Sequence, residues 1–308
     1  MIGFFLNKEN SMMKRNQFIL IFTLMTQVRL TQKNKLFKSM TWPADQAWSN
    51  WCDALQVAMV SDLRKSERNQ LQQFLQQEDL SAQLLSMAAT MPYITIFDGT
   101  YPKRLKEIWN PPLVLFYQGD LTYLQKPCLT VVGARQNGAY GQTILQQWLP
   151  QLVAQGVVIV SGLARGVDAL AHEITLAAGG STVAVIGTGL MRTYPASHRA
   201  LQSAISQQGL ILSEYLPDVG PQKQYFPERN RILAGLSYNT LVVEARRQSG
   251  SLITASLAVQ NNRSVLAVPG AVTYDCAQGC NELIQQGAEP VLNAQDVMQA
   301  LKAHYWWF

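Results

Sequence analysis

From residue 113 onward, hydrophobic positions occur in short continuous runs, and many of their residues are β-branched. The runs cover 113–117, 129–132, 157–160, 182–186, 210–212, 241–243 and 265–268. Most neighbouring runs are separated by one helix-length segment. Strands that are apolar throughout and alternate with helices are typical of a parallel sheet covered by helices on both faces. The pattern therefore predicts an α/β fold with an open, doubly wound, mostly parallel sheet.

The first part of the chain has a different pattern. Between residues 44 and 88, apolar residues such as Trp48, Trp51 and Leu55 recur at helical spacing. Proline and glycine interrupt regular structure between residues 92 and 112. We therefore expect a small helical N-terminal domain over 41–98 and the α/β domain over 99–308, with a last helix near 294–303.

Residues 1–40 carry most of the excess positive charge. They hold seven Lys and Arg against Glu9 alone, whereas the rest of the chain has 18 basic and 19 acidic residues. The overall charge is thus weak evidence for DNA binding. The apolar segment 18–25 is too short to cross a bilayer and is not followed by a cleavage site. We expect an uncertain leader or a start assigned too early, with Met40 as an alternative start and an export signal as the less favoured alternative.

The cysteine content does not indicate a disulfide framework. Four cysteines in 308 residues, with Cys128 inside an apolar run, fit a reducing compartment. Cys276 and Cys280 lack a second Cys or His pair nearby, and a structural zinc ion needs four ligands. We expect a cytoplasmic protein without a membrane segment, a metal or a cofactor.

Glycine-rich segments follow three of the predicted strands. In open α/β sheets, ligands bind outside the carboxyl ends of the strands. Small residues there let backbone N–H groups approach an anion, and the following helix adds partial positive charge. Arg135 and Arg165 place cations beside these turns, so we predict a phosphate-binding rim. The residues assigned to it are Arg135, Ser161, Gly162, Arg165, Gly166, Gly187, Thr188 and Gly189.

A second cluster, residues 223–231, interleaves aromatic and basic side chains. Bases of a single strand stack on aromatic rings while cations neutralise the backbone. The residues assigned to this cluster are Lys223, Phe226, Arg229, Asn230 and Arg231. A buried ring at a helix start is the alternative for Phe226. Arg229 and Arg231 are not expected to project together, and an internal ion pair is the alternative for one of them.

Signatures of catalysis are missing from the sequence. It contains no G-x-x-x-x-G-K-[ST] loop, no complete G-x-G-x-x-G after a strand and no G-x-S-x-G elbow. Asp168 and His172 lie four residues apart, and we assign them a structural or capping role. Glu244 follows a predicted strand but has no evident nucleophile as a partner. We therefore expect no catalytic residues.

These segments together, in their order, resemble the DNA-processing protein A (DprA/Smf) family. The resemblance covers roughly residues 99–290 and rests on Gly133-Ala134-Arg135 (with Ala134 where the family usually has Ser), 161–172, 187–190 and above all 226–237. It implies an extended Rossmann-like fold and a homodimer. It also implies sequence-independent binding of single-stranded DNA, protection of incoming DNA and loading of the RecA recombinase during natural transformation. The implied strand contacts are Arg135, the 187–189 loop, Lys223 and Phe226.

Two features depart from the family, and one rival function stays open. The N-terminal unit does not match the family's usual sterile-α-motif-like domain, and no C-terminal winged-helix module is recognised. The rival is a Rossmann-like protein that binds nucleotides or cleaves nucleoside monophosphates, with Glu244 and residues 249–254 in its site. The P-G-G-x-G-T-x-x-E signature of such hydrolases is absent. Competition between mononucleotides and DNA would discriminate the two functions.

Overall fold

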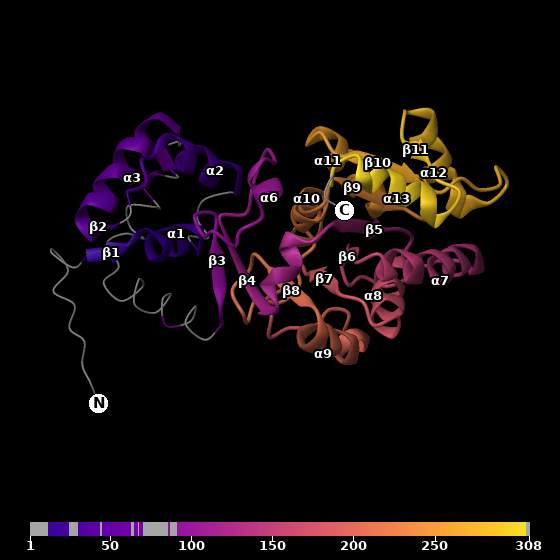
Figure 1. The fold of residues 1–308 in the computed structure, drawn as a ribbon. Coiled ribbons are helices and arrows are strands. Elements are labelled where there is room, and N and C mark those ends of the chain that lie inside the picture. The colour runs from indigo at the N-terminus through magenta and orange to yellow at the C-terminus, as the bar shows by residue number, and fades with distance from the viewer. Residues whose placement is uncertain are drawn as a thin grey trace.

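The structure, a computed structural model, describes residues 12–24, 30–43, 45–62 and 91–305, together with residues 65, 66, 68, 69 and 86. Its main feature is a nine-stranded sheet with the order β11-β10-β9-β5-β6-β7-β8-β4-β3, shown in Figure 1. The strands are β3 (Tyr93–Thr95), β4 (Val114–Gly119), β5 (Cys128–Val132), β6 (Val158–Ser161), β7 (Thr182–Val185), β8 (Leu210–Ser213), β9 (Asn239–Val242), β10 (Ser264–Ala267) and β11 (Glu289–Pro290).

The strands from β8 to β11 in this order pair in parallel, and β4 pairs antiparallel with both β8 and β3. The sheet winds outward from β5 in two directions, first through β6 to β8 and then through β9 to β11. This confirms the predicted doubly wound, mostly parallel α/β fold. Each predicted apolar run coincides with one of the strands β4 to β10, to within two residues at either end.

Helices cover both faces of the sheet. α7 (Ala139–Ala154), α8 (Val167–Ala177) and α13 (Ala294–Lys302) share one hydrophobic cluster with inward residues of β5, β6, β9 and β10. α10 (Tyr225–Leu236), α11 (Gly250–Gln260) and α12 (Asp275–Gln285) contribute to the other cluster, and α9 (Arg199–Gln208) packs against β4, β7 and β8. The short elements are α6 (Lys103–Lys106) and the 3-10 turns η1 (Leu121–Gln125) and η2 (Ala196–His198).

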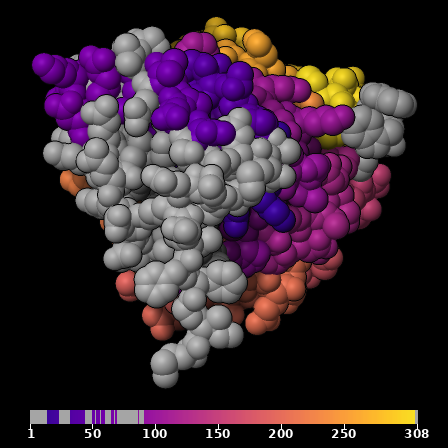
Figure 2. All heavy atoms as spheres, turned by 90° about the vertical axis from the view of Figure 1, so that its left-hand side faces the viewer, coloured from indigo at the N-terminus to yellow at the C-terminus, as the bar shows by residue number. Residues whose placement is uncertain are grey.

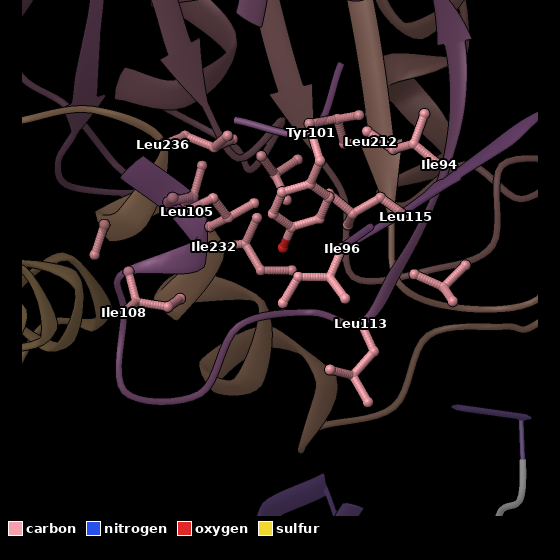
Figure 3. Packing of buried hydrophobic residues seen from close by; sticks show 14 of the residues in the cluster. Ile94, Ile96, Tyr101, Leu105, Ile108, Leu113, Leu115, Leu212, Ile232 and Leu236 are labelled. Atoms are coloured by element: carbon pink, nitrogen blue, oxygen red, sulfur yellow. The ribbon is translucent and has the colours of Figure 1, made fainter. Parts of the chain in front are cut away.

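One part of the core fixes the position of α10. Figure 3 shows Ile232 and Leu236 of α10 beside Tyr101, Leu105 and Ile108, which belong to residues 101–108 in and around α6 (the α6 segment). The Tyr101 hydroxyl donates to the Pro112 carbonyl over 2.7 Å, so its polar end is satisfied inside the core. A side chain at Gly235 would come within 2.8 Å of Leu105 and Ile108, so glycine permits this close approach. Because α10 is held here, its first turn has a defined position at the opposite end.

The N-terminal unit joins the sheet through its first helix. It comprises β1 (Met12–Lys14), α1 (Arg15–Leu24), α2 (Leu30–Ser39), β2 (Asp45–Ala47) and α3 (Trp48–Asp62). Residues 18–22 of α1 are buried in the same cluster as Ile94 of β3, and Phe18 stacks on Trp51 with ring centroids 4.7 Å apart. In Figure 2, described residues of this unit lie directly beside the magenta residues of the sheet domain. The unit therefore contacts the α/β domain through β3 and β4.

Two helices of the N-terminal unit, α1 and α2, lie within residues 1–40, the predicted leader, and α1 packs on β3 and β4. The predicted boundary near residue 98 falls after β3, which belongs to the sheet. Residues 70–85 of the predicted helical domain lie outside the described residues. The choice between a leader and an early start stays a prediction. No helix within the described residues is long and apolar enough to cross a membrane.

Candidate nucleic-acid interface

A cavity of about 680 Å³ opens at the carboxyl ends of β5, β6, β7 and β9. β5 lies where the two directions of the sheet diverge, and the loops after β5 and β9 separate there. Such a crevice is the usual ligand site of a doubly wound sheet. Four arginines line this cavity against one carboxylate, that of Asp168; they are Arg135, Arg165, Arg229 and Arg246. The cavity is therefore strongly positive and suited to an anion.

The loop after β5 is locked to the start of α8. The Val167 backbone N–H donates to the Ala134 carbonyl over 3.1 Å. Gly166 has φ of 79°, a conformation that favours glycine, and an added Cβ there would collide with the Ala134 carbonyl. A Cβ at Gly133 would meet the Val167 side chain within 2.9 Å. This close packing fixes the loop that carries the exposed Arg135.

Arg229 forms the floor of the cavity. Its side chain is buried, and Nη1 donates to the carbonyl oxygens of Gly162, over 2.6 Å, and of Val185. Among the described residues its buried Nε has no hydrogen-bond partner. Burial lowers the pKa of Arg229; Asp168 opposes that shift, and the neighbouring Arg135 adds to it through like-charge repulsion. The cavity thus holds the positively charged side chains of Arg135 and Arg229, and the single carboxylate of Asp168 balances their charge only in part.

Asp168 partly balances this charge. Burial raises the pKa of its carboxyl group, while Arg229 and hydrogen bonds from the Ala164 and Gly162 backbone N–H groups oppose the shift. Its position in the first turn of α8 also places the carboxylate near the positive end of the helix. These contacts agree with the structural role that the sequence indicated for Asp168.

Two aromatic side chains line the same cavity. Phe226, in the first turn of α10, lies against Gly187, where an added Cβ would approach the ring to 3.0 Å. Tyr194, in the loop after β7, has its ring centroid 5.3 Å from that of Phe226, with 43° between the planes. Arginines and aromatic rings therefore share one concave surface.

The structure brings most of the predicted site residues together. Those that line the cavity are Arg135, Gly162, Arg165, Gly187, Thr188, Phe226, Arg229 and Asn230. Those that do not line it are Ser161, Gly166, Gly189, Lys223 and Arg231. Their DNA contacts stay predictions.

The residues outside the cavity have identifiable positions. Ser161 is buried and donates to the Val131 carbonyl over 2.7 Å. Gly189 allows the loop after β7 to approach the Leu216 and Pro217 carbonyls, and Lys223 is exposed before α10. Arg231 is buried and forms an ion pair of 2.6 Å with Glu214. The internal ion pair considered for one of the two arginines is therefore that of Arg231.

Glu244 and His172 are engaged in structural contacts. The Glu244 carboxylate is buried and accepts hydrogen bonds from the Gly138 and Gly141 backbone N–H groups over 2.9 and 3.0 Å, at the start of α7. It also accepts from the Tyr274 hydroxyl over 2.8 Å. Burial, Arg229 and His198 lower the pKa of His172 to about 3. In the part of the chain that the structure describes, no cluster of His, Cys, Asp or Glu side chains is arranged to hold a metal ion.

Several lining residues were not assigned to the DNA site from the sequence. Residues 249–251 were considered only for the rival nucleotide site, and Arg246 for neither. All of them lie between the end of β9 and the first turn of α11, so their position after a strand indicates them as well as it does Arg135. Gln136 directly follows the predicted rim. Tyr194 lies ten residues beyond the middle of β7, in a loop, where no periodic pattern indicates which way its ring points.

The fold and the cavity together define a class, an extended Rossmann-like α/β protein with an arginine-lined cavity at the divergence of its sheet. The family described as DNA recombination-mediator protein A matches residues 92–302. The chain belongs to this family, as its resemblance to DprA/Smf proteins indicated.

Individual relatives extend the match over most of the chain. The DNA processing protein DprA of Streptococcus pneumoniae is 44% identical over 207 residues, which is 67% of this chain and 73% of the relative. That of Bacillus subtilis is 37% identical over 264 residues, covering 84% of this chain and 88% of the relative.

Solved structures agree with the fold. The DNA processing protein A structure from S. pneumoniae superposes with a TM-score of 0.79 at 36% identity and covers 92% of this chain and 97% of that chain. The Helicobacter pylori structure gives a TM-score of 0.61 at 32% identity and covers 68% of this chain and 96% of that chain. The H. pylori protein is described as having a unique mode of single-stranded DNA binding.

Proposed function

We propose that this chain binds single-stranded DNA, without sequence preference, in the arginine-lined cavity. The observation that carries the proposal is the pair Arg135 and Arg229. Burial lowers the pKa of Arg229, and repulsion from Arg135 adds to the shift. Both arginines line the cavity, where Asp168 is the one carboxylate among the described lining residues. A phosphate group bound beside them would compensate their positive charge.

The aromatic rings favour a single strand over other phosphate ligands. Phe226 and Tyr194 lie on the same cavity as the arginines, and unpaired bases stack on such rings whatever their identity. Phosphate contacts and stacking read no base edges, so binding is independent of sequence. The described single-stranded DNA binding of the H. pylori relative supports the same ligand.

The proposed contacts divide by position. Arg135, Arg165 and Arg229 neutralise the backbone, and the glycines at 162 and 187 leave space beside them. Asn230 offers a polar side chain at the cavity, and Thr188 lines it while its hydroxyl donates to the Arg192 carbonyl. Lys223 extends the positive surface in front of α10. Ser161, Gly166 and Gly189 shape the loops. Arg231 acts through its ion pair with Glu214, which supports α10.

We further propose a wider role, which the family's description as a DNA recombination mediator supports. A recombination mediator delivers DNA to a recombinase, so we assign the chain the protection of incoming single strands and the loading of RecA during natural transformation. We place it in the cytoplasm, as a homodimer, with no catalytic step and no cofactor. Glu244 supports the non-enzymatic role, because its carboxylate already accepts three hydrogen bonds.

The experiment is fluorescence anisotropy of labelled oligo-dT with mononucleotides as competitors. Arg246→Ala and Arg247→Ala form a matched pair, because Arg246 lines the cavity whereas Arg247 is exposed and pairs with Glu282. We expect Arg135→Ala, Phe226→Ala and Arg246→Ala to weaken binding and Arg247→Ala to leave it unchanged. Mononucleotides that displace DNA at low concentration, or are cleaved to free base, would instead support the nucleotide-binding or hydrolase alternative.

RecA loading is tested separately. The measurement is RecA ATP hydrolysis on single strands already covered by single-strand-binding protein. We expect the chain to shorten the lag before hydrolysis, and Arg135→Ala to restore the full lag. An unchanged lag with wild-type protein would contradict the loading role and leave the DNA-binding proposal standing.

A further inference from the structure

Tyr194 is an aromatic residue that lines the cavity and is about half exposed to solvent. It is 52% exposed, although it lies within contact distance of Phe226. Fully burying such a ring would stabilise the protein, and large exposed apolar side chains that line a cavity are typical of ligand sites. The ring therefore has surface left for a ligand.

The loop that carries Tyr194 is held firmly in place. The Thr188 hydroxyl donates to the Arg192 carbonyl over 3.2 Å, and the Gln202 side chain donates to the same oxygen over 3.3 Å. The Arg192 guanidinium donates from Nε to the Asp218 carbonyl over 3.0 Å. Two segments distant in sequence thus brace the loop. A side chain on a braced loop loses little conformational entropy when a ligand binds.

The spacing of the two rings determines how bases can use them. A base placed between two rings needs about 7 Å between them, twice the usual contact distance. The Tyr194 and Phe226 centroids are 5.3 Å apart, so the rings contact each other and leave no gap between them. Phe226 also lies against the Gly187 backbone. Bases can therefore stack only on the outer faces of the two rings, which together form one continuous aromatic surface.

We propose that Tyr194 is a second base-stacking residue, which continues the surface of Phe226 and takes an unpaired base through its ring. The proposal rests on the proposed function and names a specificity determinant of that site. Because a ring stacks only on a base that has left its helical neighbours, Tyr194 contributes to the preference for single strands over duplex. The arginines of the cavity bind the phosphates of both.

The test compares Tyr194→Leu, Tyr194→Phe and wild type on oligo-dT and on an oligonucleotide of equal length built from abasic residues. Met191→Leu is the matched control, since Met191 is 59% exposed in the same loop but does not line the cavity. We expect Tyr194→Leu to bind oligo-dT about tenfold more weakly. Tyr194→Phe and Met191→Leu should bind like wild type. On the abasic strand, Tyr194→Leu and wild type should bind equally.

The outcomes separate this inference from the proposed function. If Tyr194→Leu lost affinity equally for oligo-dT and for the abasic strand, residue 194 would act on the backbone or on the loop structure. If it lost affinity for neither, residue 194 would take no part in binding. Either result overturns the inference. A wild-type chain that fails to bind oligo-dT overturns the proposed function instead. As a spectroscopic check, 2-aminopurine in the oligonucleotide should be quenched by wild type and Tyr194→Phe more than by Tyr194→Leu.

Discussion

Arg229 donates a hydrogen bond of 2.6 Å from Nη1 to the carbonyl oxygen of Gly162, and only a glycine at position 162 leaves room for its guanidinium. A Cβ there would lie 2.6 Å from Cζ of Arg229 and still closer to Nη1. The loop after β6 and the helix α10 are thus fitted to each other at the floor of the cavity. This contact places the buried guanidinium of Arg229 at the same cavity that Arg135 lines.

The first prediction concerns Gly162→Ala. The added methyl group displaces the Arg229 guanidinium, because both cannot occupy the same space. We expect affinity for oligo-dT to fall about tenfold or more, as for the loss of one or more charge-assisted contacts. Gly220→Ala is the control, because a Cβ at Gly220 meets nothing within 4 Å. Equal binding by both variants in anisotropy would show that the position of Arg229 does not matter for DNA.

Arg231→Met tests the structural role of the second arginine. The change leaves the Glu214 carboxylate buried without its cation, so we expect unfolding free energy to fall by about 3–5 kcal/mol. The double variant Arg231→Met, Glu214→Gln should recover part of the loss. Urea unfolding measures both. DNA affinity that falls while stability stays unchanged would place Arg231 among the DNA contacts.

His172 predicts a defined pH dependence of stability. Its pKa is lowered to about 3 in the folded chain, against about 6.5 for an unperturbed histidine. Below pH 6.5 the His172 imidazole binds a proton in the unfolded chain but stays neutral in the folded chain. The unfolding free energy therefore falls toward pH 3 by about 1.4 kcal/mol per pH unit. Above pH 6.5 the group has no effect.

The matched variant is His172→Asn. The Thr182 hydroxyl donates to the Ile159 carbonyl, so His172 donates from Nδ1 to the Thr182 oxygen, over 2.7 Å. Asparagine keeps a donor near that position and does not titrate. We expect it to be less stable at pH 7 but to lose less stability on acidification. The unfolding free energy of both proteins is measured in urea at each pH. If it fell with pH equally in wild type and in His172→Asn, the assignment would be contradicted.

Glu244→Gln distinguishes capping from catalysis. The amide keeps one oxygen and turns an N–H₂ group toward backbone donors at the start of α7. We therefore expect a loss of about 1–3 kcal/mol in unfolding free energy, as for buried donors left unpaired. Neither protein should release free base from nucleoside monophosphates. Release by wild type that the variant abolishes would make Glu244 catalytic.

Most of the sheet could be predicted from the sequence, because strands buried on both faces read as continuous apolar runs. β11 could not, since Glu289 and Pro290 are both exposed at the edge of the sheet. β3 is short and packs partly against α1, so only its tertiary contacts distinguish it from a loop.

The candidate site shows a different limit. Arg229 and Arg231 lie two residues apart in one helix, about 200° around its axis, so the sequence indicates that only one can face the cavity. Which one does depends on how α10 packs against the α6 segment at Gly235. Tyr194 depends on contacts between two loops, which leave no periodic pattern. Long-range packing decides both cases.

The measurement that tests the central claim most directly is the affinity of oligo-dT across a salt series for wild type and Arg135→Gln. If the cavity binds the phosphate backbone, the logarithm of the association constant falls linearly with the logarithm of salt, by about 0.7 per phosphate neutralised. We predict that Arg135→Gln weakens binding and reduces that slope by about 0.7. Affinity that is insensitive to salt, or a slope that Arg135→Gln leaves unchanged, would contradict the account.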